Sequence, residues 1–365
     1  MALKDIQTQF FTQQGATPPV IGGAAAFALG SSLKVIGISA LGVPTLEATV
    51  VTVSSSANDT LATDTNNLAY VMGRRTPDTD SRLEIFDVSV RSAPAQLASL
   101  AAASSNDGYR MFRVGTTLWV AVDDTSTTDE PDTLRGFDVS TPAAPSLTAT
   151  YDLLLDFPVA QPDMSQLIGA DGGNVVVIAS DLVGGCRIGI YDVSVPLAVS
   201  QESTTDLVGA GQPALAINYP LLYVYQGAPT STISIYDITN AAAPLLLGSV
   251  GGLGISLFMS HFPDNGFLYL NAISPLDTGI RVVDVSVPAA PVLIGSVAPS
   301  GVVNRNSSVV ATNQRLIVFN RAIAGGPMKA QVYDASNAGA GVLTLLGEVN
   351  YNVLVVIPNS PWALN

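Results

Sequence analysis

Short apolar runs, separated by turns rich in glycine, proline, asparagine and aspartate, follow one another along almost the whole chain. Residues 214–250 show the unit, with apolar runs at 214–218, 221–225, 233–238 and 245–250. Runs of this length between turn residues are typical of β-strands. Four of them in succession predict one antiparallel up-and-down sheet. Many runs lack polar alternation, which predicts that both faces of each sheet are buried.

One phrase recurs within this pattern: two apolar or aromatic residues, an aspartate, an apolar residue, and a serine or threonine. Its copies are spaced by 45–54 residues, and a period near fifty residues is typical of a β-propeller. Each blade of a propeller lies between two neighbours, so this architecture also supplies burial on both faces. The copies are centred on Gly37, Asp87, Asp138, Asp192, Asp237, Asp284 and Asp334.

The repeated aspartates lie where the third strand of each blade turns into the fourth. Side chains of Asp and Ser bond nearby backbone amides and stabilise such turns. A ring of catalytic or metal-binding carboxylates is the alternative. Because the residues recur at equivalent turns in separate blades, we interpret them as structural. These structural turn residues are Asp87, Asp138, Asp192, Asp237, Asp284 and Asp334.

The phrase resembles the LVIVD-type propeller repeat, in which Leu-Val-Ile-Val-Asp-Ile-Ser is followed by prolines and Leu-Gly. Residues 280–295 and 233–248 carry the resemblance, which extends over roughly 25–350. The first copy departs from the repeat at Gly37, and the fourth has Val199 and a serine where the second proline is expected. The resemblance implies a propeller fold but no single activity, because such repeats occur in surface and secreted proteins of varied role.

The predicted architecture is all-β: a seven-bladed β-propeller of four-stranded antiparallel blades, formed by residues 21–365. Residues 353–357 are apolar and follow the last copy. We expect this C-terminal strand to supply the inner strand of the first blade and to close the ring. Residues 1–20 remain as an N-terminal arm, whose apolar stripe predicts docking on a partner or packing against its own propeller. The stripe consists of Leu3, Ile6, Phe10 and Phe11.

Charge and composition exclude several classes of function. The net charge is −14, and no basic cluster exceeds the pair Arg74-Arg75, so we expect no nucleic-acid partner. One cysteine and one histidine exclude an intrachain disulfide, a cysteine-based metal site and a multi-histidine site. No apolar run is long enough for a membrane span, and the polar first residues do not resemble a secretory signal.

Recognition is expected in the long loops that share one face of the propeller, because they vary in length while the opposite turns are stereotyped. The densest acidic loop spans 123–132. Calcium prefers such oxygen ligands, but the spacing matches no EF-hand, so a solvated acidic loop is the favoured interpretation. The candidate recognition residues are Arg74, Arg75, Asp78, Asp123, Asp124, Asp129, Glu130, Asp132, Asp156 and Asp163.

No catalytic constellation is visible around His261 or Cys186, so we predict a non-enzymatic binding or scaffold protein without a cofactor. The specific hypothesis is a structural protein of a tailed-phage virion: a capsid decoration, tail or fibre appendage made in the host cytoplasm without a signal peptide. Its expected partners are other virion or surface proteins and a host glycan or surface receptor. The alternatives are an exported cell-surface propeller and a propeller enzyme that acts on glycans through converging carboxylates.

Overall fold

The structure of the chain is a computed structural model, and the residues that it describes form seven four-stranded sheets. The described residues are 8–10, 24–29, 32–39, 41–52, 60–63, 67–74, 81–103, 107–124, 133–153, 156, 163–170, 175–182, 185–208, 214–226, 231–253, 258–264, 266–272, 279–297, 304–312, 314–322 and 329–350.

Each sheet is antiparallel and is built from four strands that follow one another in the sequence. The first four sheets contain β1 (Thr8–Phe10), β2 (Ala24–Leu29), β3 (Ser32–Ile38) and β4 (Pro44–Val51); β5 (Thr60–Thr63), β6 (Leu68–Arg74), β7 (Ser81–Asp87) and β8 (Ala95–Ala103); β9 (Asp107–Val114), β10 (Thr117–Asp124), β11 (Thr133–Asp138) and β12 (Ser146–Asp152); and β13 (Asp163–Ala170), β14 (Val175–Leu182), β15 (Gly185–Asp192) and β16 (Ser200–Val208). The last three contain β17 (Ala214–Asn218), β18 (Leu221–Gln226), β19 (Thr232–Asp237) and β20 (Leu245–Val250); β21 (Phe258–Asp264), β22 (Phe267–Ala272), β23 (Ile280–Asp284) and β24 (Val292–Val297); and β25 (Asn304–Thr312), β26 (Arg315–Ala322), β27 (Lys329–Asp334) and β28 (Thr344–Asn350).

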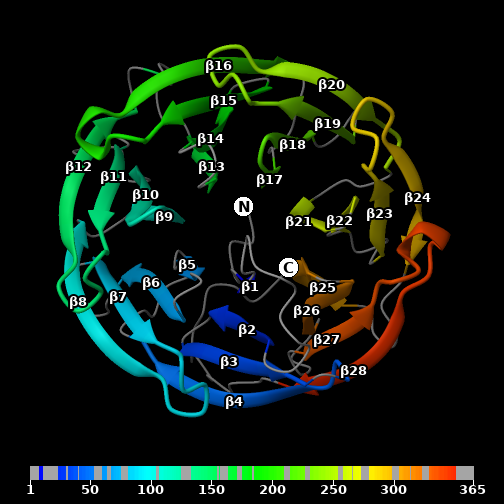
Figure 1. The fold of residues 1–365 in the computed structure, drawn as a ribbon, viewed down its shortest axis with the longest axis horizontal. Coiled ribbons are helices and arrows are strands. Elements are labelled where there is room, and N and C mark those ends of the chain that lie inside the picture. The colour runs from blue at the N-terminus through cyan, green and yellow to red at the C-terminus, as the bar shows by residue number, and fades with distance from the viewer. Residues whose placement is uncertain are drawn as a thin grey trace, which may run out of the picture.

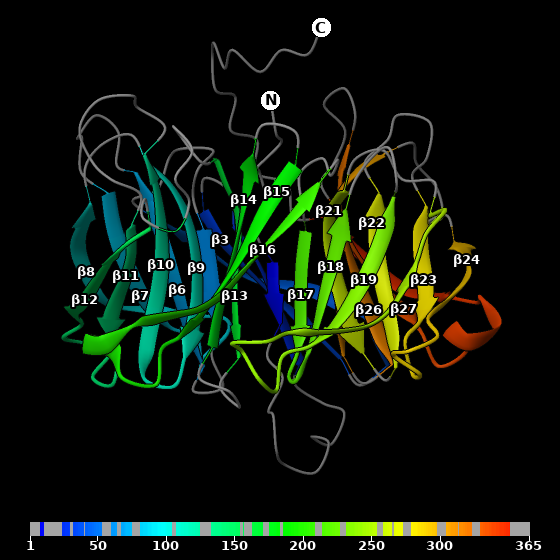
Figure 2. The ribbon, with the colours of Figure 1, turned by 90° about the horizontal axis from the view of Figure 1, so that it is seen from above.

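The sheets are arranged around a common centre, with the first strand of each sheet innermost and the fourth on the perimeter (Figure 1). Seen from the side, the strands run between the two faces of a disc (Figure 2). Inner strands of successive sheets contact one another, and β1 contacts both β5 and β25. On the perimeter β4 contacts β28. The first and last sheets are therefore neighbours, and each sheet keeps its own four consecutive strands.

The innermost strand of the first sheet corrects one prediction. We expected residues 353–357 to take this position, but they lie outside the described residues. The position is held instead by β1, which pairs with β2 in the register Thr8↔Ala28 and Phe10↔Ala26. Strands adjacent in sequence tend to be neighbours in a sheet, so the segment that precedes β2 completes the sheet without the other end of the chain.

The prediction that both faces are buried holds for the middle strands and is wrong for the outer ones. In β23, four of the five residues are buried, and the buried side chains of adjacent sheets form shared clusters. Short 3-10 turns precede two outer strands, at η2 (Pro196–Ala198) and η3 (Ala338–Ala340). In β20, by contrast, no residue is fully buried, because the fourth strand has no further strand outside it. Among the described residues, no helix is long and apolar enough to cross a membrane.

Every sheet also has a β-bulge at the same place, where its fourth strand inserts one extra residue opposite the third. Such a bulge kinks a strand and redirects the side chain of the extra residue. Its repetition shows that the outer strand curves in the same way in every sheet. The inserted residues are Glu47, Leu97, Thr148, Glu202, Leu247, Ile294 and Leu346.

The turn of one sheet covers the outer strand of the preceding sheet at several seams. A Cβ placed on Gly248 would lie 2.6 Å from the carbonyl oxygen of Pro288 in the next turn. A Cβ on Gly347 would lie 3.0 Å from Pro44, so the last sheet meets the first in the same manner. The glycine of the Leu-Gly pair thus has a packing role at these two seams, because only a residue without a side chain allows so close an approach.

Candidate functional site

The repeated aspartates form hydrogen-bonded turns on the face of the disc where third strands pass into fourth strands. In all six copies, Oδ1 of the aspartate accepts a hydrogen bond of 2.7–2.9 Å from the backbone N–H of the Ser or Thr two residues later. These carboxylates therefore hold the backbone of their own turns. The six residues are Asp87, Asp138, Asp192, Asp237, Asp284 and Asp334.

These hydrogen bonds lower the pKa of several turn aspartates. For Asp87, Asp237 and Asp284, the chief cause of the lowered pKa is the hydrogen bond with the hydroxyl of the Ser or Thr two residues later. For Asp138 and Asp334, the backbone N–H is the chief cause of the lowered pKa. Because a hydrogen bond to the ionised form favours that form, folding stabilises the charged carboxylate at each of these turns.

Thermal stability is expected to fall as the pH drops below about 4. A carboxyl whose pKa is lower in the folded than in the unfolded chain contributes stability above its unfolded pKa of about 3.9 and loses it as the pH falls through the folded value. The double change Asp284→Asn and Asp334→Asn removes two titrating turns but keeps the acceptor oxygens, so it should weaken the pH dependence. Melting curves from about pH 6 to pH 2.5 measure the pH dependence of the native chain and of the double variant. A melting temperature of the native chain that stays constant over this range would contradict the inference that the ionised turn aspartates stabilise the fold.

The first copy of the repeat forms its turn differently. With Gly37 in place of aspartate, the backbone N–H of Ser39 donates to the carbonyl of Val43 at 3.0 Å, and the backbone N–H of Val43 donates to Oγ of Ser39 at 3.0 Å. Oε1 of Glu47 occupies the space that a side chain at Gly37 would need. The other carboxylate oxygen of Glu47 forms an ion pair of 3.4 Å with Nε of Arg91, in the turn of the second sheet.

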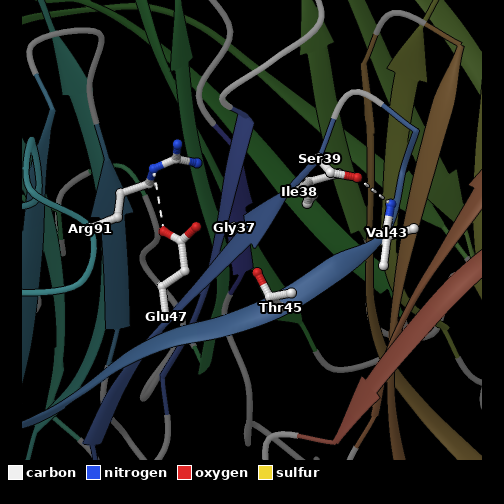
Figure 3. Close-up of a pocket in the computed structure, with 7 residues that line it drawn as sticks. All are labelled: Gly37, Ile38, Ser39, Val43, Thr45, Glu47 and Arg91. Carbon is white, nitrogen blue, oxygen red and sulfur yellow. Dashed lines mark hydrogen bonds and ion pairs between the residues drawn. The ribbon is translucent and has the colours of Figure 1, made fainter.

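A pocket opens at this place, with a volume of about 270 Å³. Figure 3 shows Glu47 reaching across the strand that bears Gly37 toward Arg91, with Thr45 on the same strand as the glutamate. The sequence indicated that the first copy was unusual. It did not indicate a pocket, because the glutamate that replaces the usual aliphatic residue lies ten positions away. The lining residues are Gly37, Ile38, Ser39, Val43, Thr45, Glu47 and Arg91.

One of the predicted recognition residues, Asp156, belongs to a polar cluster between the third and fourth sheets. Its Oδ2 accepts a hydrogen bond of 3.1 Å from the hydroxyl of Tyr191, and its backbone carbonyl accepts one of 2.8 Å from Arg187. Arg187 also makes two hydrogen bonds to the carboxylate of Asp206, at 2.5 and 2.8 Å. The ring of Tyr151 packs edge-on against Tyr191, with centroids 5.6 Å apart.

The cluster perturbs the ionisation of its members. Burial raises the pKa of Asp156, while hydrogen bonds from Tyr151 and Tyr191 oppose the rise. Burial, followed by the charge of Asp156, raises the pKa of Tyr151 to about 12 and raises the pKa of Tyr191 as well. Hydrogen bonds from Arg187 lower the pKa of Asp206. These groups bond to one another and tie the connection between β12 and β13 to the fourth sheet.

The remaining predicted recognition residues are not brought into a described site. Arg74 ends β6, Asp123 and Asp124 end β10, and Asp163 begins β13. Of the predicted docking stripe, Phe10 lies in β1, and a docking role of the arm stays a prediction. Within the described ranges no group of metal-ligating side chains is assembled. The predicted residues outside the described ranges are Leu3, Ile6, Phe11, Arg75, Asp78, Asp129, Glu130 and Asp132.

The structure also has a surface of exposed apolar side chains that was not predicted from the sequence. Apart from Val51, the exposed large apolar side chains among the described residues all lie in the third-to-fourth-strand turns or in the first three residues of the fourth strands. Every sheet contributes at least one of them, and we call this belt the apolar rim. Its members are Leu41, Val43, Leu46, Val90, Leu97, Leu147, Val195, Leu197, Leu245, Leu246, Val287, Val292, Val342 and Leu345.

Comparisons with known proteins agree with this architecture. Residues 273–298 match the LVIVD repeat family, which confirms the resemblance inferred from residues 280–295. No curated protein sequence matches the chain. A protein from Lactobacillus plantarum has a similar structure over 95% of this chain and 100% of its own, with 13% identity and a TM-score of 0.62.

Two further solved structures have the same fold at low sequence identity. A hypothetical selenium-binding protein from Sulfolobus tokodaii is 12% identical, covers 92% of each chain and has a TM-score of 0.65. A periplasmic gluconolactonase of Pseudomonas aeruginosa is 11% identical, covers 88% of this chain and 93% of its own, and has a TM-score of 0.65. At these identities the likeness establishes a propeller-like all-β fold and nothing about activity.

Proposed function

We propose that the chain is a closed, seven-bladed β-propeller that acts as a non-enzymatic scaffold and binding protein, and that it is a structural component of a virion. The seven consecutive four-stranded sheets, and the contacts of β1 with β25 and of β4 with β28, support the closed ring. In this form it decorates a capsid or belongs to a tail or fibre, where it contacts other virion proteins and a host surface.

The apolar rim is the observation that carries the proposal. In Leu197 and Leu41 the exposed fractions are 83% and 79%, so these side chains are almost fully in contact with water. Single exposed apolar residues are ordinary on protein surfaces, but their concentration in one belt marks an interaction surface. Aspartates and serines of the turns lie between them, giving the mixture of apolar centres and polar surroundings that is found in protein–protein interfaces.

Incorporation into particles tests the proposal. Leu197→Asp and Leu41→Asp place a charge in the rim. We expect each to lower the amount of the chain in purified virions by about tenfold or more, because an unpaired buried carboxylate weakens binding. Thr204→Asp adds the same charge to an exposed residue of β16 outside the rim and serves as the control. All three should keep the native circular dichroism spectrum.

Two results would contradict the proposal. The first is the absence of the native chain from purified virions; recovery in the cell-surface fraction instead would favour the exported binding protein. The second is incorporation of both rim variants at the level of the Thr204→Asp control, which would show that the rim does not bind the partner. Hydrolysis of a glycan by the purified chain would favour the alternative that the protein is a propeller enzyme acting on glycans.

A further inference from the structure

Two departures from the repeat meet at one point of the first sheet. Four other sheets combine an aspartate in the phrase with an aliphatic residue at the bulge: Asp87 with Leu97, Asp237 with Leu247, Asp284 with Ile294, and Asp334 with Leu346. The first sheet has Gly37 and Glu47 at these two positions. In the first sheet the carboxylate of Glu47 lies where an aspartate side chain at Gly37 would lie, whereas the fourth sheet keeps Asp192 beside its bulge residue Glu202.

Gly37 and Glu47 both line the pocket, together with Arg91 of the next sheet. The ion pair between Glu47 and Arg91 is partly exposed, with exposed side-chain fractions of 28% and 31%. Ion pairs at such exposure add little to stability, because water and salt screen them. The ion pair is therefore not a strong structural contribution of Glu47 and Arg91 to this seam.

The groups around the pocket match the chemistry of a polyol. Oε1 of Glu47, over the floor formed by Gly37, accepts hydrogen bonds. The hydroxyls of Ser39 and Thr45 both donate and accept, and the guanidinium of Arg91 donates. Side chains of Ile38 and Val43 add an apolar wall. Hydroxyl groups of a sugar both donate and accept, so adjacent ones can donate to the carboxylate and accept from the guanidinium.

Charge and size narrow the class of ligand. The glutamate and arginine cancel each other's charge, which favours a neutral ligand over an anion or a cation. The volume of about 270 Å³ lies just below the range of roughly 300–1,000 Å³ that accommodates drug-sized ligands. A single six-membered sugar ring with its hydroxyl groups fits this size.

We propose that the pocket between the first two sheets, built by Gly37, Glu47 and Arg91, binds a neutral saccharide residue. The site lies on the face of the turns, opposite to the long loops in which the sequence predicted recognition. It does not depend on assembly into a particle, since all of its lining residues come from one chain. Because the pocket is small and open, the expected dissociation constant is on the order of 1 mM.

Saturation-transfer difference NMR with the methyl α-glycosides of glucose, galactose and mannose tests the site. At least one glycoside should bind the native chain. The double variant Gly37→Asp/Glu47→Leu has the combination of aspartate and leucine found in the second, fifth and seventh sheets, so it should fold and lose binding by about tenfold or more. Glu202→Leu is the matched control: Glu202 is also a bulge residue, but its sheet keeps Asp192. Binding by this variant should equal that of the native chain.

A second variant keeps the test decisive if the double variant does not fold. Glu47→Gln retains the shape of the side chain and replaces the charged acceptor, and it should weaken binding by about tenfold. The proposal is overturned if none of the three glycosides binds the native chain. It is equally overturned if Gly37→Asp/Glu47→Leu folds and binds like the native chain, or if acetate or phosphate binds and competes where the glycosides do not.

Discussion

Replacing Trp119 with alanine is expected to lower the free energy of unfolding by about 3–5 kcal/mol. Trp119 is among the largest fully buried side chains. It packs with Leu134 and Tyr191 in a cluster shared by the third and fourth sheets. A Cβ on Gly136 would lie 3.0 Å from the indole ring, so the absence of a side chain there leaves room for the ring. Alanine would leave a cavity at the seam between two sheets, and the surrounding strands can close it only partly.

Denaturation in guanidinium chloride, followed by far-UV circular dichroism, measures this loss. The control is Trp119→Phe, which keeps most of the ring volume. Nε1 of Trp119 is buried without a hydrogen-bond partner among the described residues, so phenylalanine breaks no described hydrogen bond of the ring. We expect it to cost less than the alanine change, because the cavity that it leaves is smaller. An alanine variant as stable as the phenylalanine variant would show that this seam is not tightly packed.

Replacing Gly248 with alanine is expected to destabilise the fold by about 1–3 kcal/mol. The new Cβ would lie 2.6 Å from the carbonyl oxygen of Pro288 and 2.9 Å from backbone atoms of Ala289. These atoms belong to the backbone of the next turn, so relief requires the turn of the sixth sheet to move away from the fifth. The loss arises from the contact between two sheets and not from the conformation of the glycine.

Gly295 provides a matched control at the equivalent position of the next sheet. A Cβ there would have no atom of the described residues within 4 Å, so Gly295→Ala should be neutral or stabilise the fold by about 0.4–1 kcal/mol through the unfolded chain. If Gly248→Ala lowers the free energy of unfolding and Gly295→Ala does not lower it in the same assay, the turn of the next sheet lies closer to Gly248 than to Gly295. Equal effects of the two changes would contradict the packing described at this seam.

The repeating parts of the fold were predictable from sequence because their physical causes are local. Alternation of apolar runs with turn residues predicted the strands, and the position of Asp284 and its equivalents predicted a turn that the hydrogen bonds now describe. The short strand β1 was not predicted, because Thr8, Gln9 and Phe10 form no apolar run. Its place in the first sheet depends on pairing with β2, which the pattern of three residues does not encode.

The surfaces of interest depend on three-dimensional contacts and could not be predicted in this way. Leu245 and Leu222 look alike in the sequence, yet one lies exposed on an outer strand and the other is buried between sheets. Apolar character alone does not distinguish an edge strand from a central one. The pocket, likewise, needs Gly37 and Glu47 from one sheet and Arg91 from the next, and only the arrangement of the sheets brings them together.

The central claim is that the repeats build a closed ring of seven blades that binds its partners through the apolar rim. An electron cryo-microscopy reconstruction of purified virions, with the chain located in the map, tests this claim most directly. The account predicts a seven-bladed ring whose turns around Leu197 and Leu41 are covered by neighbouring virion proteins. A map in which this rim faces solvent on all sides, or from which the ring is absent, would contradict it.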